Sequence, residues 1–225
     1  MALIPDLSIL PPRQLELWQE IDGTPDHFTL YGGTALALRL GHRASVDFDF
    51  FSNHPFNPEQ LARSIPYLAD AEYVQIAPNT LTCRLDRGGP VLVSFFGDLG
   101  LGRVASREQV KDRKIYVASL LDIAGTKVAV VQQRADAKDY IDIDAIMQTG
   151  IDLATMLAAG KIIYGKTFNP LLTLKALSYF DDVPELSAVI KNRLINAVRK
   201  TDLECLPVLE PFQSRNRHSG EGFQP

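Results

Sequence analysis

The sequence predicts an α+β fold in which a mixed β-sheet flanked by helices is followed by an all-helical half. Short, mainly apolar segments bounded by glycine, proline or asparagine recur up to residue 96, which is typical of buried strands. From residue 119 the apolar residues instead recur at helical spacing. We therefore expect an α/β domain over residues 1–118, a helical domain over 119–210 and a mobile tail over 211–225, which has almost no apolar content.

The first half divides into short helices and strands at its glycines and prolines. Asn57-Pro58 opens one helix, and Pro66 is expected to kink or end it. The predicted helices cover 12–21, 35–40 and 58–68, and the predicted strands cover 28–31, 46–51, 73–77, 81–85 and 91–96. The connector from Asp98 to Asp112 is rich in glycine and charge. Bases and acids alternate along it and beyond, so we interpret it as a solvated loop.

Helices account for the second half. The segment Ser119-x-x-Asp122 has the form of a capping box and opens the first of them. The predicted helices cover 119–134, 136–149, 153–158, 170–179 and 186–199.

The stretch from Phe28 to Phe51 organises the first half. Gly32-Gly33 ends an aromatic and β-branched strand, and Thr34 is placed to cap the short helix that follows. A helix N-terminus behind two glycines offers free backbone N–H groups and the positive end of the helix dipole. The sequence therefore predicts a phosphate-binding turn here.

Two carboxylates follow the helix on the next strand. Residues two apart on a strand point the same way, so Asp47 and Asp49 share one face while Phe48 and Phe50 pack behind. Paired carboxylates beside a phosphate site are the ligands that Mg²⁺ prefers. Asp47 and Asp49 are therefore the predicted Mg²⁺ ligands.

These residues carry a resemblance to a known family. Gly32-Gly33-Thr34 followed by Arg43-x-Ser45-x-Asp47-x-Asp49 resembles the nucleotidyltransferase superfamily, whose fold is polymerase β-like. More narrowly, it is similar to the AbiEii/AbiGii toxin family, the toxin half of type IV toxin–antitoxin pairs. Either half of the motif alone is only moderately specific, whereas the two at a separation of one short helix are much stronger.

The resemblance implies a nucleotidyltransferase-like sheet and a nucleotide site. It assigns the serine of the motif to Ser45. The residues expected to bind the nucleotide are Gly32, Gly33, Thr34, Arg43, Ser45 and Arg134. From its position, Arg43 either contacts a phosphate or simply pairs with an acid.

Lys127 and Arg134 lie seven residues apart in or next to an apolar helix. Spacing alone leaves two interpretations: both face a cleft that holds a triphosphate, or both extend to water from a core helix. The resemblance favours the first, because the family has a lysine in such a helix, then an arginine and a KD/RD-x-x-D segment. Lys138-Asp139-x-x-Asp142 matches that segment, so Lys127 and Asp139 join Asp47 and Asp49 as the predicted catalytic residues. The alternative for this segment is structural, because Asp136 and Asp139 are first-turn acids that favour a helix N-terminus in any case.

One departure from the superfamily concerns the third carboxylate. Nucleotidyltransferases commonly carry it on a later strand, where this sequence has Ser94 in VLVSFF. Three interpretations stay open: Ser94 replaces the ligand, Asp139 or Asp142 supplies it, or activity is reduced.

Composition limits the remaining function classes. Hydrophobic residues make up 46%, charged residues 22% and the net charge is −4, so nucleic-acid contact would need a local basic patch. Cys83 and Cys205 match no metal or redox spacing, and the four histidines are scattered. His42, next to Arg43, either contacts substrate or has a role on a loop surface, and we expect the second. With no apolar run long enough for a membrane span and no signal peptide, we expect a cytoplasmic protein that does not contact a membrane.

Together these features predict a Mg²⁺-dependent nucleotidyltransferase. It would transfer a nucleotide from an NTP to an acceptor hydroxyl, by resemblance an RNA 3′ end and tRNA in particular, with a protein hydroxyl as runner-up. As the toxin of a type IV pair it would also bind a cognate antitoxin. The alternative is a non-catalytic nucleotide- or partner-binding module, which the missing acid at Ser94 favours.

Overall fold

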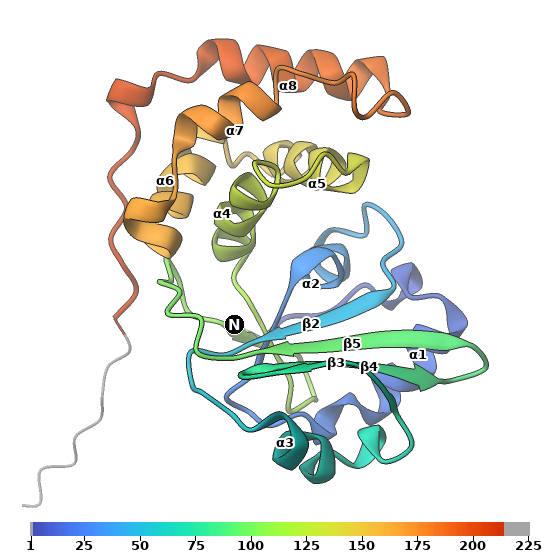
Figure 1. The fold of residues 1–225 in the computed structure, drawn as a ribbon. Helices are drawn as coiled ribbons and strands as arrows, with labels where there is room; N and C mark the ends of the chain where they lie inside the picture. The colour runs from blue at the N-terminus through green and yellow to red at the C-terminus, as the bar shows by residue number, and fades with distance from the viewer. Residues whose placement is uncertain (1, 214–225) are drawn as a thin grey trace, which may run out of the picture.

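The computed structural model describes residues 2–213 and contains a seven-stranded mixed β-sheet (Figure 1). The strands are β1 Thr29–Tyr31, β2 Asp47–Phe51, β3 Glu72–Ala77, β4 Thr80–Asp86, β5 Pro90–Phe96, β6 Glu108–Gln109 and β7 Tyr116–Val117. Their order across the sheet is β3-β4-β5-β2-β1-β7-β6. β2 thus lies at the centre, antiparallel to β1 and parallel to β5.

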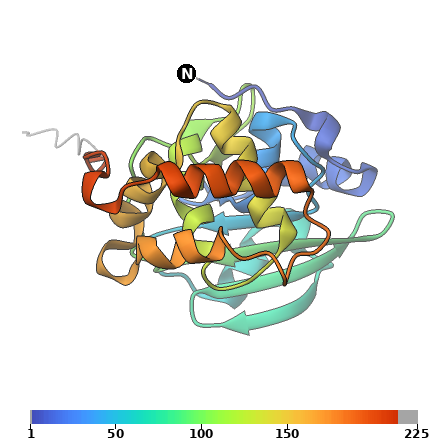
Figure 2. The same ribbon diagram turned by 90° about the horizontal axis from the view of Figure 1, so that it is seen from above.

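The α-helices of the described chain cover both faces of the sheet. They are α1 Pro12–Glu20, α2 Gly32–Leu40, α3 Pro58–Ser64, α4 Leu120–Val130, α5 Ala137–Gln148, α6 Leu153–Tyr164, α7 Pro170–Ala176 and α8 Ala188–Lys200. In Figure 1, α1 and α3 lie below the sheet, and α2 lies above it beneath α4 and α5. Figure 2 shows α8 crossing over the other helices, where it packs on α5.

The two faces of β2 have opposite characters. Phe48 and Phe50 are fully buried, and their rings stack with those of Trp18 and Phe95 respectively, in the core on the α1 side. Because side chains alternate along a strand, the aspartates at 47 and 49 face the α2 side. The core below the sheet therefore orients both carboxylates toward the helical layer.

Local sequence patterns predicted the long strands closely. Each of the five strands β1 to β5 begins and ends within one residue of its predicted position. Asn57 caps α3 by accepting a hydrogen bond from Gln60 N at 2.9 Å, and α3 ends at Ser64, before Pro66. Ser119 likewise caps α4, accepting from Asp122 N at 3.0 Å.

Other boundaries differ from the prediction. α2 begins at Gly32, so Thr34 lies inside the first turn and is not the cap. α4 ends at Val130, four residues before Arg134, because the chain turns there to bring Arg134 back toward α5. α6 continues to Tyr164, well beyond 158. The predicted solvated loop after Asp98 contains β6, which pairs with β7.

The chain changes from sheet to helix directly after β7, which is where the sequence predicts the boundary between domains. The division into two domains itself stays a prediction. Of the predicted mobile tail, residues 214–225 lie outside the described residues; within 211–213, Phe212 N donates to the carbonyl of Arg103 at 2.7 Å. Among the described residues no single helix has the length and apolar character to cross a bilayer, and only the bent pair of α5 and α6 matches by length and composition.

Candidate active site

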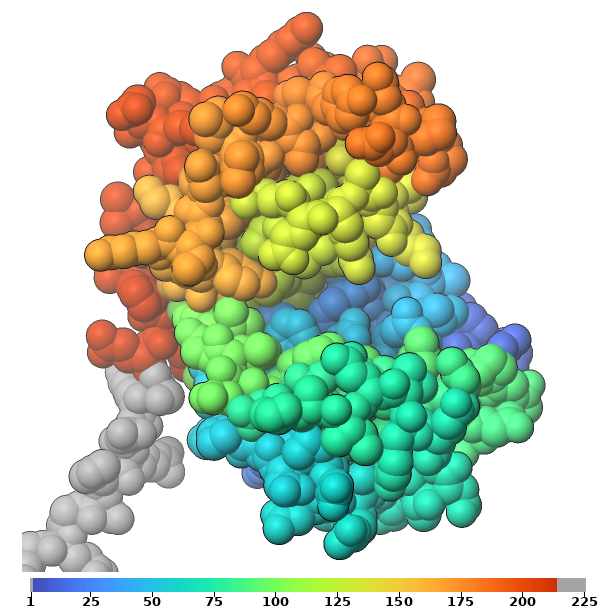
Figure 3. Space-filling model, in the orientation of Figure 1, coloured from blue at the N-terminus to red at the C-terminus, as the bar shows by residue number. Residues whose placement is uncertain are grey.

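A hollow separates the helical layer from the open face of the sheet. Figure 3 shows it between α5, in yellow, and the β4–β5 region, in green, with the blue of the α2 and β2 segments at its floor. Asp47 and Asp49 lie on the face of β2 that α2 packs against, and α2 in turn packs against α4 and α5. The predicted site residues from both halves of the chain therefore meet around α2.

The turn into α2 leaves room that only glycine permits. Gly32 has a φ of +72°, and a Cβ built there would lie 2.7 Å from Oδ2 of Asp49. A Cβ at Gly33 would lie 2.6 Å from Nη2 of Arg43. Tyr31, the N-cap residue, makes no side-chain capping bond. Since the first amides of a helix have no intrahelical partner, this end of α2 offers donors beside the carboxylates.

Thr34 and Ser45 fix the turn that carries the carboxylates. The Thr34 hydroxyl donates to Ser45 Oγ at 2.8 Å, and it also lies within hydrogen-bonding distance of the carbonyl of Asp47. Both side chains are buried. In this structure the two residues hold the start of β2 against α2, which is a positioning contact.

The two carboxylates differ in their surroundings. Asp47 is exposed, whereas Asp49 is half-buried, and burial together with the charge of Asp47 raises the pKa of Asp49 to about 6. The charges of Lys127 and Arg134 act in the opposite direction on that pKa, so both cations lie on the Asp49 side of the sheet. Two oxygen ligands that repel each other fit a divalent cation, which binds hard oxygen donors and relieves the repulsion.

Ser94 on β5 occupies the place where the superfamily commonly has its third carboxylate. In the β2–β5 pairing, Ser94 lies directly opposite Asp49, and its hydroxyl accepts a hydrogen bond from Thr82 at 3.3 Å. No group of three metal-binding side chains is found among the described residues. A cation at Asp47 and Asp49 would therefore take its remaining ligands from water and substrate phosphates, as Mg²⁺ commonly does.

A buried ionic cluster joins the helical half to the phosphate turn. Lys127 Nζ contacts Asp139 Oδ1 at 2.9 Å and Asp142 Oδ2 at 2.6 Å, and both carboxylates are fully buried. Arg134 adds a contact to Asp139 Oδ2 at 2.8 Å. Arg43 donates two hydrogen bonds to the carboxylate of Asp142, from Nε at 2.7 Å and from Nη2 at 2.8 Å. Three permanent cations thus meet two carboxylates, and the cluster keeps a net positive charge.

The cluster decides part of what spacing left open. Only 7% of the Lys127 side chain is exposed, so the interpretation that it extends to water is wrong for Lys127, whereas 60% of the Arg134 side chain is exposed. Arg134 belongs to the turn after α4 and meets Lys127 only through their shared partner Asp139. Arg43 pairs with an acid, as one of its two interpretations predicted. The catalytic and nucleotide-binding roles of these residues stay predictions.

His42 lies in the loop between α2 and β2, but its side chain does not have the predicted surface role. The side chain is only 11% exposed, and Nε2 lies 2.7 Å from Asp142 Oδ1. Its Nδ1 is buried without a partner among the described residues. The available signal was its place directly before Arg43 in the motif.

We expect Gly33→Val to weaken NTP binding by about tenfold or more. The new side chain would push against Arg43 and Ser45 and block the approach of a phosphate to the α2 amides. Isothermal titration with a non-hydrolysable NTP measures the effect, with Gly23→Ala as the control, because Gly23 also lacks a positive φ and its new Cβ would have its nearest contact at 3.3 Å. Unchanged affinity in a folded Gly33→Val protein would move the phosphate site elsewhere.

Asp142 should contribute to stability in a pH-dependent way. Burial opposes its ionisation, but the hydrogen bonds from His42 and Arg43 and the charge of Lys127 outweigh burial and hold its pKa well below the ordinary value. A lowered folded pKa adds stability that is present above about pH 4 and is lost as the pH falls further. We expect Asp142→Asn to lower the free energy of unfolding at pH 7 by about 3 kcal/mol.

Urea denaturation at several pH values tests this. The difference between wild type and Asp142→Asn should shrink below about pH 4, because the carboxyl of the unfolded wild-type chain then takes up a proton while the folded carboxyl still resists it. Asp70→Asn changes an exposed acid and should show no such difference. A gap between wild type and Asp142→Asn that is the same at every pH would contradict the role of the charge.

Comparisons with known proteins agree with this geometry. The model of the nucleotidyl transferase AbiEii toxin family of type IV toxin–antitoxin systems matches residues 17–204. An uncharacterized protein of Aquifex aeolicus (strain VF5) is 33% identical over 166 residues, covering 72% of this chain and 78% of the relative.

The fold has a counterpart among solved structures. The chain is similar to MenT4, a nucleotidyltransferase toxin of Mycobacterium tuberculosis H37Rv, with a TM-score of 0.53 and 15% identity over 84% of each chain. The mixed sheet with its flanking helices is thus a nucleotidyltransferase-like fold. Because the family model spans most of the chain, this protein is a nucleotidyltransferase of the AbiEii toxin family.

Proposed function

We propose that the protein transfers a nucleotide from an NTP to an acceptor hydroxyl in a Mg²⁺-dependent reaction. The observation that carries this proposal is the placement of Asp47 and Asp49 beside the open N-terminus of α2, with the positive cluster around Lys127 on the same side. An acceptor oxygen bonds to the α-phosphorus and the bond to the bridging oxygen of the β-phosphate breaks. Pyrophosphate leaves, and the acceptor proton passes to solvent.

Mg²⁺ held by Asp47 and Asp49 supplies neutralisation of charge on the α-phosphate and on the leaving pyrophosphate. The chain's own groups do the rest. The amides of Gly33 and Thr34 face the β- and γ-phosphates, and Arg134, 60% of whose side chain is exposed, reaches them from the helical side. Lys127 pairs with Asp139 and Asp142 and holds positive potential next to Asp49.

The acceptor that we propose is an RNA 3′ end, tRNA in particular, with a protein hydroxyl as runner-up. The net charge of −4 means that RNA must meet a local cationic surface. We also propose that the protein acts in the cytoplasm as the toxin of a type IV pair and is countered by a cognate antitoxin.

Ser94 supports one rival. The rival is a nucleotide- or partner-binding module without turnover, and the absence of an acid opposite Asp49 favours it. Incubation of the purified protein with each labelled NTP and Mg²⁺, in the presence of total tRNA or of cell protein, separates the two functions. Mg²⁺-dependent label in RNA supports the proposal; label in protein selects the runner-up; tight NTP binding without transfer to either supports the binding module.

A further inference from the structure

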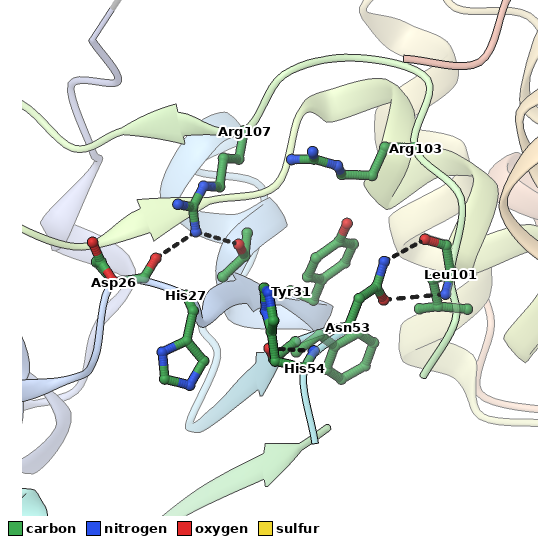
Figure 4. Close-up of a pocket in the computed structure, with 11 residues that line it drawn as sticks. Asp26, His27, Tyr31, Asn53, His54, Leu101, Arg103 and Arg107 are labelled. Carbon is green, nitrogen blue, oxygen red and sulfur yellow. Dashed lines mark hydrogen bonds between the residues drawn. The ribbon is translucent and has the colours of Figure 1, made fainter. Parts of the chain in front are cut away.

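A second recess opens on the same face of the sheet, beyond the carboxylates. The cavity has a volume of about 340 Å³, which is enough for one nucleotide-sized group. It is formed by β1 and the residues that lead into its start, by the end of β2 and by the connector after β5. In Figure 4, Arg103 and Arg107 lie on one side and His27 and His54 on the other, with Tyr31 between them.

The pocket is lined by two arginines and two histidines, and by Asp26 as its acidic residue. Among the residues that the structure describes, neither Arg103 nor Arg107 has a carboxylate within ion-pair distance. Arg107 Nη1 instead donates to the carbonyl of Asp26 at 2.5 Å and to Thr29 Oγ1 at 3.3 Å. This is unlike the cluster around Lys127, where each cation contacts an acid.

The basic groups of the pocket lower one another's pKa values. Burial, the nearby His54 and Arg107 lower the pKa of His27, against the pull of Asp26. Burial and Arg103 also lower the pKa of Arg107. Both effects mark a place where positive charges gather and where the nearby carboxylate of Asp26 offsets them only in part, so an anion is the ligand that would relieve the repulsion.

Aromatic rings form another wall of the pocket. Tyr31 and Phe51 stack with ring centroids 4.8 Å apart and an interplanar angle of 14°. His27 and His54 meet edge to face at 5.9 Å. Arginines combined with aromatic faces are the usual surface for single-stranded nucleic acid, because the rings contact bases or sugars and the guanidinium groups bind phosphate.

The location relates the pocket to the reaction. Tyr31 is the register partner of Asp49, and Phe51 is two residues further along β2, about 7 Å away. The phosphate turn at Gly33 and Ser45 lies toward the opposite end of β2. In phosphoryl transfer the entering and leaving oxygens lie in line on opposite sides of phosphorus. With the pyrophosphate at the turn, the acceptor would enter from the pocket side.

We infer that this pocket binds the 3′-terminal nucleotide of a single-stranded RNA acceptor, with Arg103 and Arg107 on its phosphate and the Tyr31–Phe51 wall against its sugar or base. The inference rests on the proposed function, because it assigns the RNA acceptor of that reaction to a place. It also explains why basic residues of the connector point into the fold.

Fluorescence anisotropy with a short single-stranded RNA, labelled at its 5′ end, tests the inference on the full chain. Arg103→Gln should raise the Kd for RNA by about tenfold. It should also reduce the slope of log K against the logarithm of the salt concentration by about one. Arg103 is preferred to Arg107, whose side chain also holds the backbone at Asp26. The Kd for NTP should stay within about twofold, because the NTP phosphates bind at α2.

Arg63→Gln is the matched control, since Arg63 is an exposed arginine on α3 across the sheet. Its Kd for RNA should equal that of wild type. An unchanged RNA Kd in folded Arg103→Gln, a wild type that binds no RNA, or a weakened NTP Kd with normal RNA binding would each overturn the inference. If wild type transfers label to RNA but Arg103→Gln leaves the RNA Kd unchanged, the proposed function stands and the RNA-binding pocket is rejected. If Arg103→Gln weakens RNA binding but wild type transfers no label, the pocket stands as an RNA site and the proposed function is rejected.

Discussion

Replacing Asp49 with asparagine is expected to lower Mg²⁺-dependent nucleotide transfer by about a thousandfold while leaving the protein folded. Asparagine keeps the shape of the side chain next to Gly32 but removes the charge that a divalent cation needs. The stability of the free protein should not fall, because burial and the neighbouring Asp47 disfavour the ionised carboxylate. Label transfer over a Mg²⁺ titration, together with urea denaturation, measures both effects.

Asp47→Asn provides a second test at a more exposed ligand. It should raise the Mg²⁺ concentration needed for half-maximal transfer and lower the maximal rate, and Asp70→Asn should do neither. If Asp49→Asn kept near-wild-type transfer with the same Mg²⁺ requirement, the carboxylates of β2 would not be the metal site. The mechanism would then have to be assigned to other acids of the hollow.

The sheet and the position of the carboxylates were predictable because they depend on local patterns. Alternation along β2 decides that Phe48 and Phe50 face the core and that Asp47 and Asp49 face away from it. The apolar run of β5 and the glycine and proline residues at strand ends are equally local. Each of these signals is contained within a few consecutive residues.

The ionic cluster was beyond such signals because its partners are far apart in sequence. Arg43 and Asp142 are 99 residues apart, and nothing near Arg43 distinguishes a phosphate from this carboxylate as its partner. The inward position of Arg103 and Arg107 could not be predicted from the sequence for a similar reason. Alternating charges typify a solvated loop, and only the fold brings Arg103 and Arg107 against Tyr31.

Lys127→Met is expected to lower both stability and turnover, and the two losses should be separable. Alanine or methionine suits a helix, but either would leave Asp139 and Asp142 buried without their shared cation. Breaking a buried ion pair on one side costs about 3–5 kcal/mol. Loss of positive potential beside Asp49 should lower turnover by roughly ten- to a thousandfold.

A double variant separates these roles. Lys127→Met with Asp139→Asn removes one cation and one anion, so it should regain part of the stability that Lys127→Met loses. Arg43 still pairs with Asp142 in that protein, which limits the remaining charge imbalance. Turnover should stay low, because the potential next to Asp49 is not restored. If the double variant instead recovered turnover along with stability, Lys127 would act only by neutralising Asp139. The positive charge next to the carboxylates of β2 would then have to come from Arg134.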